Sequence, residues 1–247
     1  MKVIGISGRK QSGKNTVANY INGHILLSRE MIRSFYIDDD GKLIVETSDT
    51  NGEVGFGEFD VTRKDNDFVQ YACKELWPYV KVYHFADPLK EMAINIFGIE
   101  ARQVYGSDKD KNELTHLLWE NVPECPDGKS GYMTSRDFLQ HFGTNIVRRI
   151  YNDAWVKATV NAITREESEV AIIPDVRFPN EVEAIKKIGG TMIRLTRNIH
   201  YSNHESEVAL DKDNFDWNNF DLILDNEDLK IEQLSELLKH NSRIWSA

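Results

Sequence analysis

A glycine-rich run near the start of the sequence has the residue types and spacing of a phosphate-binding loop. Gly8, Gly13 and Lys14 fit the pattern G-x-x-x-x-G-K. Glycine lets the backbone pass close to a polyphosphate, successive N–H groups form a nest for anions, and the lysine reaches the outer phosphates. The residues that we expect to hold a nucleotide are Gly8, Arg9, Lys10, Gln11, Ser12, Gly13, Lys14, Asn15 and Thr16.

The residue after Lys14 departs from the usual loop. A Ser or Thr normally stands there, and its hydroxyl holds Mg²⁺. This chain has Asn15 instead. The Asn15 carbonyl oxygen, the Thr16 hydroxyl or a bridging water must take the place of that hydroxyl, and the sequence leaves all three open.

Two further segments carry groups suited to a second phosphate. Lys90 lies one turn into a helix that we expect to open at Asp87-Pro88, although an ordinary exposed lysine would have the same spacing. Asp175 ends the apolar run 169–174, at the place where P-loop enzymes keep a carboxylate for Mg²⁺ or its waters. Arg177 follows it. The alternative for Asp175 is a simple cap on the next helix.

The segment 134–150 predicts a helix capped by Thr134 or Ser135. Its apolar side chains recur at helical spacing: Leu139, Phe142, Ile146 and Ile150. A neighbouring face carries polar side chains: Arg136, Gln140 and Thr144. That face could be plain solvated surface. Gly143 costs about 1 kcal/mol against Ala inside a helix, which suggests close approach by a ligand or a backbone, or a kink.

Five apolar runs, each followed by helical spacing or a loop, must position these groups. They are residues 3–6, 80–86, 169–174, 192–196 and 220–224. This β–α alternation predicts one α/β domain over residues 1–247 with a parallel sheet. We expect a helix at about 65–76 and a β-rich insertion at about 34–61, because Asp40-Gly41 between apolar runs is a hairpin signal. Residues 98–133 or 197–217 are expected to cover the site as a lid.

Composition limits the partners. The net charge of −10 over 247 residues argues against nucleic-acid binding, and no apolar run approaches the ~20 residues that cross a bilayer. Cys73 and Cys125 lack metal-ligand spacing, which favours a reduced, cytoplasmic setting. We also expect no signal peptide, because a strand begins at once. Whether the chain forms a homodimer stays open.

Four motifs occur in the same order as in the phage deoxynucleoside monophosphate kinases, and the chain resembles that family. They are residues 8–16, 87–90, 136–144 and 174–177. The resemblance runs from residue 1 to Asp225-Asn226, omits the hairpin at 34–61 and is loose across 98–133. It implies a three-layer αβα nucleoside monophosphate kinase fold with a five-stranded parallel sheet of order 2-3-1-4-5. It also implies transfer of the γ-phosphoryl group of ATP, with Mg²⁺, to a deoxynucleoside monophosphate (dNMP).

The resemblance also implies roles for individual residues. The catalytic groups would be Lys14, Arg136, Asp175 and Arg177. The acceptor monophosphate would contact Leu89, Lys90, Arg136, Gln140, Gly143, Thr144, Trp155, Asp175, Arg177 and Glu181. Asn226 would lie near the adenine. The chemistry of phosphoryl transfer, rather than the resemblance, places Asn15 or Thr16 near the metal and Arg149 or Arg197 near the γ-phosphate, and the sequence does not choose within either pair.

Two other interpretations stay open. The nearer one is a different P-loop kinase of a small metabolite, such as the phosphomevalonate-type kinases, which also have a non-hydroxyl residue after Gly-Lys. The more distant one is a nucleotide-binding module without turnover. Arg136, Asp175 and Arg177 together argue against that module, because an ATP sensor needs no second phosphate site.

Overall fold

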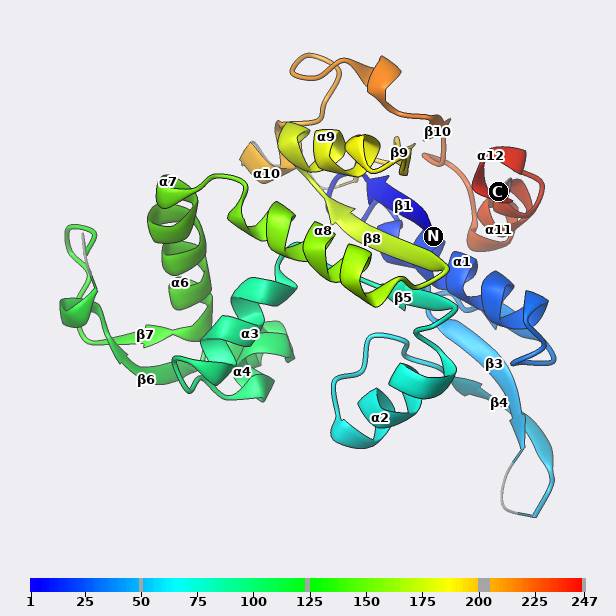
Figure 1. Ribbon diagram of the computed structural model, residues 1–247, viewed down its shortest axis with the longest axis horizontal. Helices are drawn as coiled ribbons and strands as arrows, with labels where there is room; N and C mark the ends of the chain where they lie inside the picture. The colour runs from blue at the N-terminus through cyan, green and yellow to red at the C-terminus, as the bar shows by residue number, and fades with distance from the viewer. Residues whose placement is uncertain (49–50, 123–124, 200–204, 246–247) are drawn as a thin grey trace. The chain divides into compact units, whose positions relative to one another are not determined.

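The computed structural model describes residues 1–48, 51–122, 125–199 and 205–245 (Figure 1). The chain divides into two compact units. The first unit comprises Met1–His84 and Val160–Ala247, and the second comprises Phe85–Thr159. Within the described ranges, no helix has both the length and the apolar character that a membrane span requires.

A five-stranded sheet forms the centre of the first unit. Its strands are β1 (Lys2–Ser7), β5 (Val80–Val82), β8 (Val170–Val176), β9 (Thr191–Leu195) and β10 (Leu222–Leu224). They run parallel in the order β10-β9-β1-β8-β5. Counted along the chain within this sheet, that order reads 2-3-1-4-5 from the β5 edge. The predicted α/β fold with a parallel five-stranded sheet between helices is confirmed.

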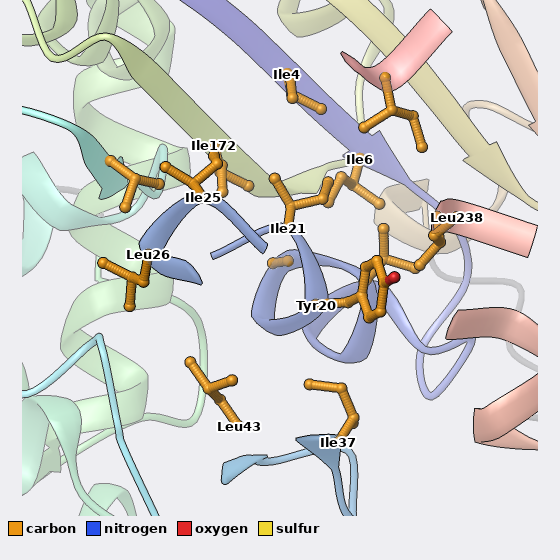
Figure 2. Packing of buried hydrophobic residues seen from close by; sticks show 14 of the residues in the cluster. Ile4, Ile6, Tyr20, Ile21, Ile25, Leu26, Ile37, Leu43, Ile172 and Leu238 are labelled. Atoms are coloured by element: carbon orange, nitrogen blue, oxygen red, sulfur yellow. The ribbon is translucent and has the colours of Figure 1, made fainter. Parts of the chain in front are cut away.

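Alternation along β1 sends side chains to opposite faces of the sheet. Ile4 and Ile6 belong to the same core cluster as Ile21 of α1 (Lys14–Ser28), and Figure 2 shows Ile6 beside Ile21. Gly5 faces the other way, and a Cβ added there would lie 2.7 Å from Ile185 on α9 (Pro179–Lys187). Helices therefore cover both faces, as Figure 1 also shows.

The predicted second strand is shorter than expected. Residues 80–86 were expected to be extended, but β5 ends at Val82. Tyr83 N–H still donates to Ile172 O at 2.8 Å. The chain then turns toward α3 (Asp87–Asn95), which has Pro88 in its first turn. Proline is well suited to that position because it has no N–H to satisfy.

The stretch predicted to be β-rich forms an antiparallel sheet of β2 (Phe35–Ile37), β3 (Leu43–Ser48) and β4 (Val54–Glu58). The hairpin predicted at Asp40-Gly41 joins β2 to β3 and is confirmed. Its apolar face packs on α1, where Gly23 leaves room for the Phe35 ring. The predicted helix follows as α2 (Asn66–Glu75), capped by Asp65.

The remaining elements of the first unit complete the cover of the sheet. Leu234 and Leu238 join the same core as α1. The bounds of these elements are α10 (Glu205–Val208), η3 (Trp217–Asn219), α11 (Ile231–Lys239) and α12 (Ser242–Trp245). Helix α8 (Ala154–Glu166) contributes its first residues to the second unit and its last to the first.

The second unit has its own small core of aromatic side chains. Phe97, Phe138 and Phe142 contact one another, with ring centroids 4.7–5.2 Å apart. Besides α3, its elements are α4 (Ala101–Tyr105), α5 (Asp108–Lys111), β6 (Leu114–Leu118), η1 (Trp119–Asn121), β7 (Tyr132–Thr134), α6 (Ser135–Gln140), η2 (His141–Val147) and α7 (Arg148–Ile150). The lid expected at 98–133 or 197–217 stays a prediction, and residues 123–124 and 200–204 of these segments lie outside the described residues.

The helix predicted at 134–150 is present but is not uniform. Thr134 caps it as predicted, and its hydroxyl accepts from Asp137 N–H. The middle, η2, is a π-helix, whose i→i+5 bonds admit more residues per turn. The predicted apolar face is therefore wrong at its end. Ile150 is 82% exposed, because the wider turn rotates it away from Leu139 and Phe142.

Candidate functional site

The glycine-rich loop connects β1 to α1 through two left-handed residues. Gln11 has φ 62° and Gly13 has φ 95°. The left-handed conformation carries little cost for Gly13 because it lacks a Cβ. Helix α1 then begins at Lys14, so its free N–H groups point toward the loop. This is the strand–loop–helix geometry that the loop pattern predicts.

Lys14 lies inside the loop. Its Nζ donates to Gly8 O at 2.8 Å and to Arg9 O at 2.7 Å. Burial lowers the pKa of Lys14 to about 8, and the positive charge of Arg177 adds to this effect. The negative charges of Glu207 and Asp175 act in the opposite direction. Lys14 is thus a desolvated cation surrounded by both signs of charge.

Asn226 supports the loop from behind. It is fully buried, and its Nδ2 donates to Ser12 O at 2.8 Å. Its Oδ1 accepts from Arg197 N–H at 3.0 Å. Arg197 in turn donates to the backbone carbonyls of Asn226 and Leu229. Both side chains therefore make hydrogen bonds to backbone groups in this structure. The predicted contacts of Asn226 with adenine and of Arg197 with the γ-phosphate stay predictions.

A partly buried ion-pair network connects the loop to β9, and Arg194 is its buried member. Asp211 accepts from Arg9 and, at 3.1 Å, from Arg194 Nη2. Arg194 Nη1 also donates to Ser7 Oγ at 2.9 Å, and its guanidinium carbon lies 5.1 Å from the Trp217 ring centroid. Burial lowers the pKa of Arg194, against the raising effect of Asp211. These ion pairs fix the Arg9 side chain beside the loop.

A second carboxylate bridges the loop and the end of β8. Glu207 Oε2 accepts from Lys10 N–H at 2.6 Å, and its Oε1 pairs with Arg177 Nη1. Burial acts to raise the pKa of Glu207, but the Lys10 N–H and the charges of Arg177 and Lys14 outweigh it and hold the pKa below its usual value. We call this whole arrangement the P-loop corner. It comprises residues 8–16, Asp175, Arg177, Arg194, Glu207 and Asp211.

Glu181 has a structural position at the start of α9. It is buried, and its Oε2 accepts from Arg177 N–H at 2.7 Å and from Phe178 N–H at 3.0 Å. These bonds satisfy backbone groups at the helix start and fix the backbone that carries Arg177. The predicted contact of Glu181 with an acceptor stays a prediction.

Asn15 and Thr16 differ in their surroundings. Asn15 is exposed. Thr16 lies against the β2–β3 turn, because a Cβ at position 41 would come within 2.4 Å of Thr16 Oγ1. Asn19 Nδ2 donates to Gly41 O at 2.8 Å and fastens the turn to α1. The inserted sheet therefore reaches the first turn of the loop helix.

In the second unit, Gly143 allows a close approach as the sequence suggested, but the approaching group is a side chain. A Cβ at position 143 would lie 2.6 Å from Leu89 Cδ2. Trp155 Nε1 donates to Gly143 O at 3.1 Å, so this carbonyl of the π-helix has a side-chain hydrogen-bond partner. Lys90 Nζ lies 4.0 Å from Asp87 Oδ1 and 4.8 Å from the Tyr105 ring centroid.

Three side chains form what we call the polar face of the second unit: Arg136, Gln140 and Thr144. All three are exposed. Arg136 Nη2 donates to Asp108 Oδ1 at 2.7 Å, and both partners of this pair are exposed to solvent. An exposed pair of this kind contributes little to stability. The polar face is thus available to an anion at small cost.

The structure brings together, within the first unit, the residues of the loop with Asp175 and Arg177. It brings together, within the second unit, Leu89, Gly143 and Trp155. Sequence reasoning missed Arg194, Glu207 and Asp211 as members of the corner. The one signal in the sequence was Arg194 itself, because a charged residue in the strand Thr191–Leu195 needs a buried partner.

Comparisons with known proteins point to one family. The sequence model of the family described as deoxynucleotide monophosphate kinase matches residues 78–238, well over half of the chain. A protein of Acanthamoeba polyphaga mimivirus, provisionally named a deoxynucleotide monophosphate kinase, is 30% identical over 140 residues. That match covers 51% of this chain and 66% of the mimivirus protein. The deoxynucleoside-5'-monophosphate kinase of Escherichia phage T5 is 26% identical over 182 residues, which cover 56% of this chain and 70% of the phage protein.

Proposed function

Because the chain belongs to the deoxynucleotide monophosphate kinase family, we propose that it transfers the γ-phosphoryl group of ATP to a deoxynucleoside monophosphate and releases dNDP and ADP. The family resemblance predicted from the sequence is confirmed, and with it the enzyme class, a phosphotransferase. One observation carries the assignment of the reaction to this site. A second cation, Arg177, lies beside the loop of the P-loop lysine, because one carboxylate, Glu207, both accepts from the Lys10 N–H of the loop at 2.6 Å and pairs with Arg177.

The donor ATP belongs to the loop. The free N–H groups of the loop and of the first turn of α1 bind phosphate oxygens. Lys14 exchanges its bonds to Gly8 O and Arg9 O for bonds to the outer phosphates. Arg9, held by Asp211, adds a fixed positive charge beside them. Asn226 contributes indirectly, because it holds the carbonyl of Ser12.

The acceptor assignment draws on both units, each taken by itself. In the first unit, Arg177 is the cation for the acceptor phosphate, and Glu181 fixes its backbone. In the second unit, Arg136, Lys90, Gln140 and Thr144 offer donors on exposed or half-buried positions. Arginine suits a phosphate better than lysine because its planar fork makes two parallel bonds. The convergence of Arg136 and Arg177 on one phosphate stays a prediction.

The residues of the corner fit Mg²⁺. This ion prefers oxygen ligands and usually takes only one or two from protein, the rest coming from phosphates and water. Asp175 supplies a carboxylate whose charge acts on Lys14, and Asn15 supplies an exposed amide oxygen. Thr16 fits less well, because its hydroxyl faces Gly41. When bound, Mg²⁺ would neutralise charge on the transferring phosphate.

Catalysis by this chain would be mainly positioning and electrostatic stabilisation. The transition state of phosphoryl transfer spreads negative charge over the equatorial oxygens. Lys14 stabilises that charge on the donor side, and Arg177 on the acceptor side. Both cations are already partly desolvated, so little reorganisation accompanies the reaction.

The test is ADP release measured with ATP and Mg²⁺ across the common deoxynucleoside and ribonucleoside monophosphates. We expect turnover with at least one deoxynucleotide and little without acceptor. The Lys14→Ala variant supplies the background. A rate of ADP release that no acceptor changes would contradict the kinase assignment. Turnover only with a different phosphorylated metabolite would place the chain among other P-loop kinases. The cytoplasmic setting and the absence of nucleic-acid binding stay predictions, and the question of a homodimer stays open.

A further inference from the structure

The Glu207 carboxylate makes its polar contacts with groups that the proposed reaction assigns to phosphates. Its Oε2 accepts from the Lys10 N–H of the loop at 2.6 Å, and its Oε1 pairs with Arg177. The side chain is only 9% exposed. A carboxylate with two such donors is a well-satisfied buried anion.

A phosphate oxygen would need the same donors. The backbone N–H of Lys10 has one hydrogen, so it cannot serve Glu207 and a phosphate together at full strength. Two anions at hydrogen-bond distance in a desolvated corner also repel each other strongly. The charge of Glu207 acts on Lys14, so the carboxylate lies within the field of the catalytic lysine.

Asp211, three residues past the end of α10, provides an internal comparison. It also contacts the loop, through Arg9, but it has a second partner in the buried Arg194. Arg194 is fixed by Ser7 and by the Trp217 ring. Asp211 therefore keeps an anchor when phosphates arrive. Both partners of Glu207 among the described residues are groups that the proposed reaction assigns to phosphates, and no buried cation comparable to Arg194 anchors it there.

We propose that Glu207 is a built-in competitor of the donor phosphates: its carboxylate takes the place of a phosphate oxygen at the Lys10 N–H of the loop and must leave before ATP binds there. The inference rests on the proposed function. Its consequence is that Glu207 lowers the affinity of the site for ATP. It also keeps Arg177 engaged, so that the cation is released for the acceptor only after the donor has displaced the carboxylate.

The experiment compares ATP binding by the full chain and by Glu207→Gln, using calorimetry with MgATP. Glutamine keeps the size of the side chain but removes the charge, and it gives up the charge-assisted bonds that ATP must break. We expect ATP to bind Glu207→Gln about tenfold more tightly. The matched control is Glu205→Gln, which removes the same charge from an exposed position of the same helix, α10, and should stay within about twofold of the parent chain.

The outcomes separate this inference from the proposed function. If the parent chain binds ATP and Lys14→Ala does not, the donor site stands. Equal or weaker ATP binding by Glu207→Gln would then overturn the role of Glu207 alone. If the parent chain itself fails to bind ATP, the proposed function fails with it.

A second measurement needs no variant, in case Glu207→Gln unfolds. Hydrogen exchange of the parent chain is followed with and without MgATP in two peptides, residues 8–16 and residues 205–211. If MgATP displaces Glu207, hydrogen exchange should become slower in the loop peptide, where phosphates bind, and faster in residues 205–211, because α10 loses its contact with Lys10. Slower exchange in both peptides would show that the carboxylate stays, and would overturn the inference.

Discussion

The P-loop corner and the polar face of the second unit hold their charged groups in different ways. In the corner, Lys14 is bonded to carbonyls, and Arg9 and Arg177 are bonded to carboxylates. On the polar face, Arg136 has an exposed partner, while Gln140 and Thr144 face solvent. A ligand at the corner must exchange existing bonds, whereas a ligand at the polar face mainly displaces water.

The difference separates two kinds of mutational effect. Substitutions in the corner should change stability and nucleotide binding together, because they leave buried partners unsatisfied. Substitutions on the polar face should change catalysis while leaving stability nearly unaltered. Each prediction below tests one side of that contrast.

The largest effect is expected at the centre of the corner. Lys14→Ala removes the cation that is needed most in the transition state, so we expect kcat to fall by about three orders of magnitude or more. ADP release under saturating ATP and acceptor measures it. Circular dichroism and thermal unfolding should show a folded protein, since the carbonyls of Gly8 and Arg9 can bond to water. A kcat close to that of the parent chain would show that the loop is not catalytic.

Local patterns in the sequence were sufficient to predict the secondary-structure elements that position this site. The loop pattern, the five apolar runs and the Asp40-Gly41 turn each depend on residues close together in the chain, and the structure shows strands and a turn at those places. The chemistry of the loop could be predicted for the same reason. Its geometry follows from a strand, two glycines and a helix start within a few residues.

The failures come from turns that local spacing does not specify. Ile150 was placed on an apolar face by assuming 3.6 residues per turn, but the π-helix at His141–Val147 changes that spacing. A π-helix depends on its surroundings, here the Leu89 side chain and the Trp155 N–H at Gly143. No pattern within the helix itself encodes them.

The carboxylates of the corner escaped prediction for another reason. Glu207 and Asp211 meet the loop across sequence separations of 197 and 202 residues. Single-sequence patterns carry no information on such pairs. Arg194 was the only local sign, because a charge within an apolar strand requires a partner. The sequence therefore identifies the cations of the site better than the anions that hold them.

The second prediction compares an arginine from each region. Arg136→Ala and Arg177→Ala should each lower kcat/KM for the dNMP by roughly ten- to a few-hundredfold, the value of a lost arginine–phosphate contact. Neither variant should weaken ATP binding measured without acceptor. Arg33→Ala, which removes an arginine 82% exposed in the first unit, is the control. Loss of ATP binding in Arg177→Ala would move that residue to the donor side.

The free energy of unfolding should also differ between Arg136→Ala and Arg177→Ala. Arg177→Ala leaves the buried Glu207 charge with one partner fewer, so we expect the free energy of unfolding to fall by about 1–3 kcal/mol. Arg136→Ala breaks only an exposed pair and should change it by less than about 0.5 kcal/mol. Urea denaturation measures both. Equal losses would remove the contrast between corner and polar face.

The third prediction uses the titration of Lys14. Its pKa is lowered to about 8 by burial, so the protein must take up a proton to bind phosphates above that pH. ATP affinity should therefore decline above pH ~8, by up to about tenfold per unit. The free energy of unfolding should move the other way, rising between pH ~8 and ~10, because the penalty for burying the charge is relieved. Calorimetry across pH 7–9.5, in buffers of different ionisation enthalpy, measures the proton uptake.

The control for this prediction is Lys14→Arg, which keeps its charge throughout the range. Its ATP affinity, even if lower overall, should be flat between about pH 7 and pH 9.5. A parallel decline in both proteins would assign the titration to another group. The polar face has no buried cation of this kind, so the dNMP KM should follow pH less steeply.

The smallest effect is expected where the inserted sheet touches the corner. Gly41 has φ +80° and Gly189 has φ +76°, so alanine is strained at either position by about 1–2 kcal/mol. Only Gly41 has a neighbour, because a Cβ there would come within 2.4 Å of Thr16 Oγ1, whereas nothing lies within 4 Å at position 189. Gly41→Ala and Gly189→Ala should therefore lose similar stability, and only Gly41→Ala should weaken ATP binding, by about two- to fivefold, because the turn pushes on the first turn of α1. Equal ATP affinity in the two variants would show that the inserted sheet braces α1 without reaching the donor site.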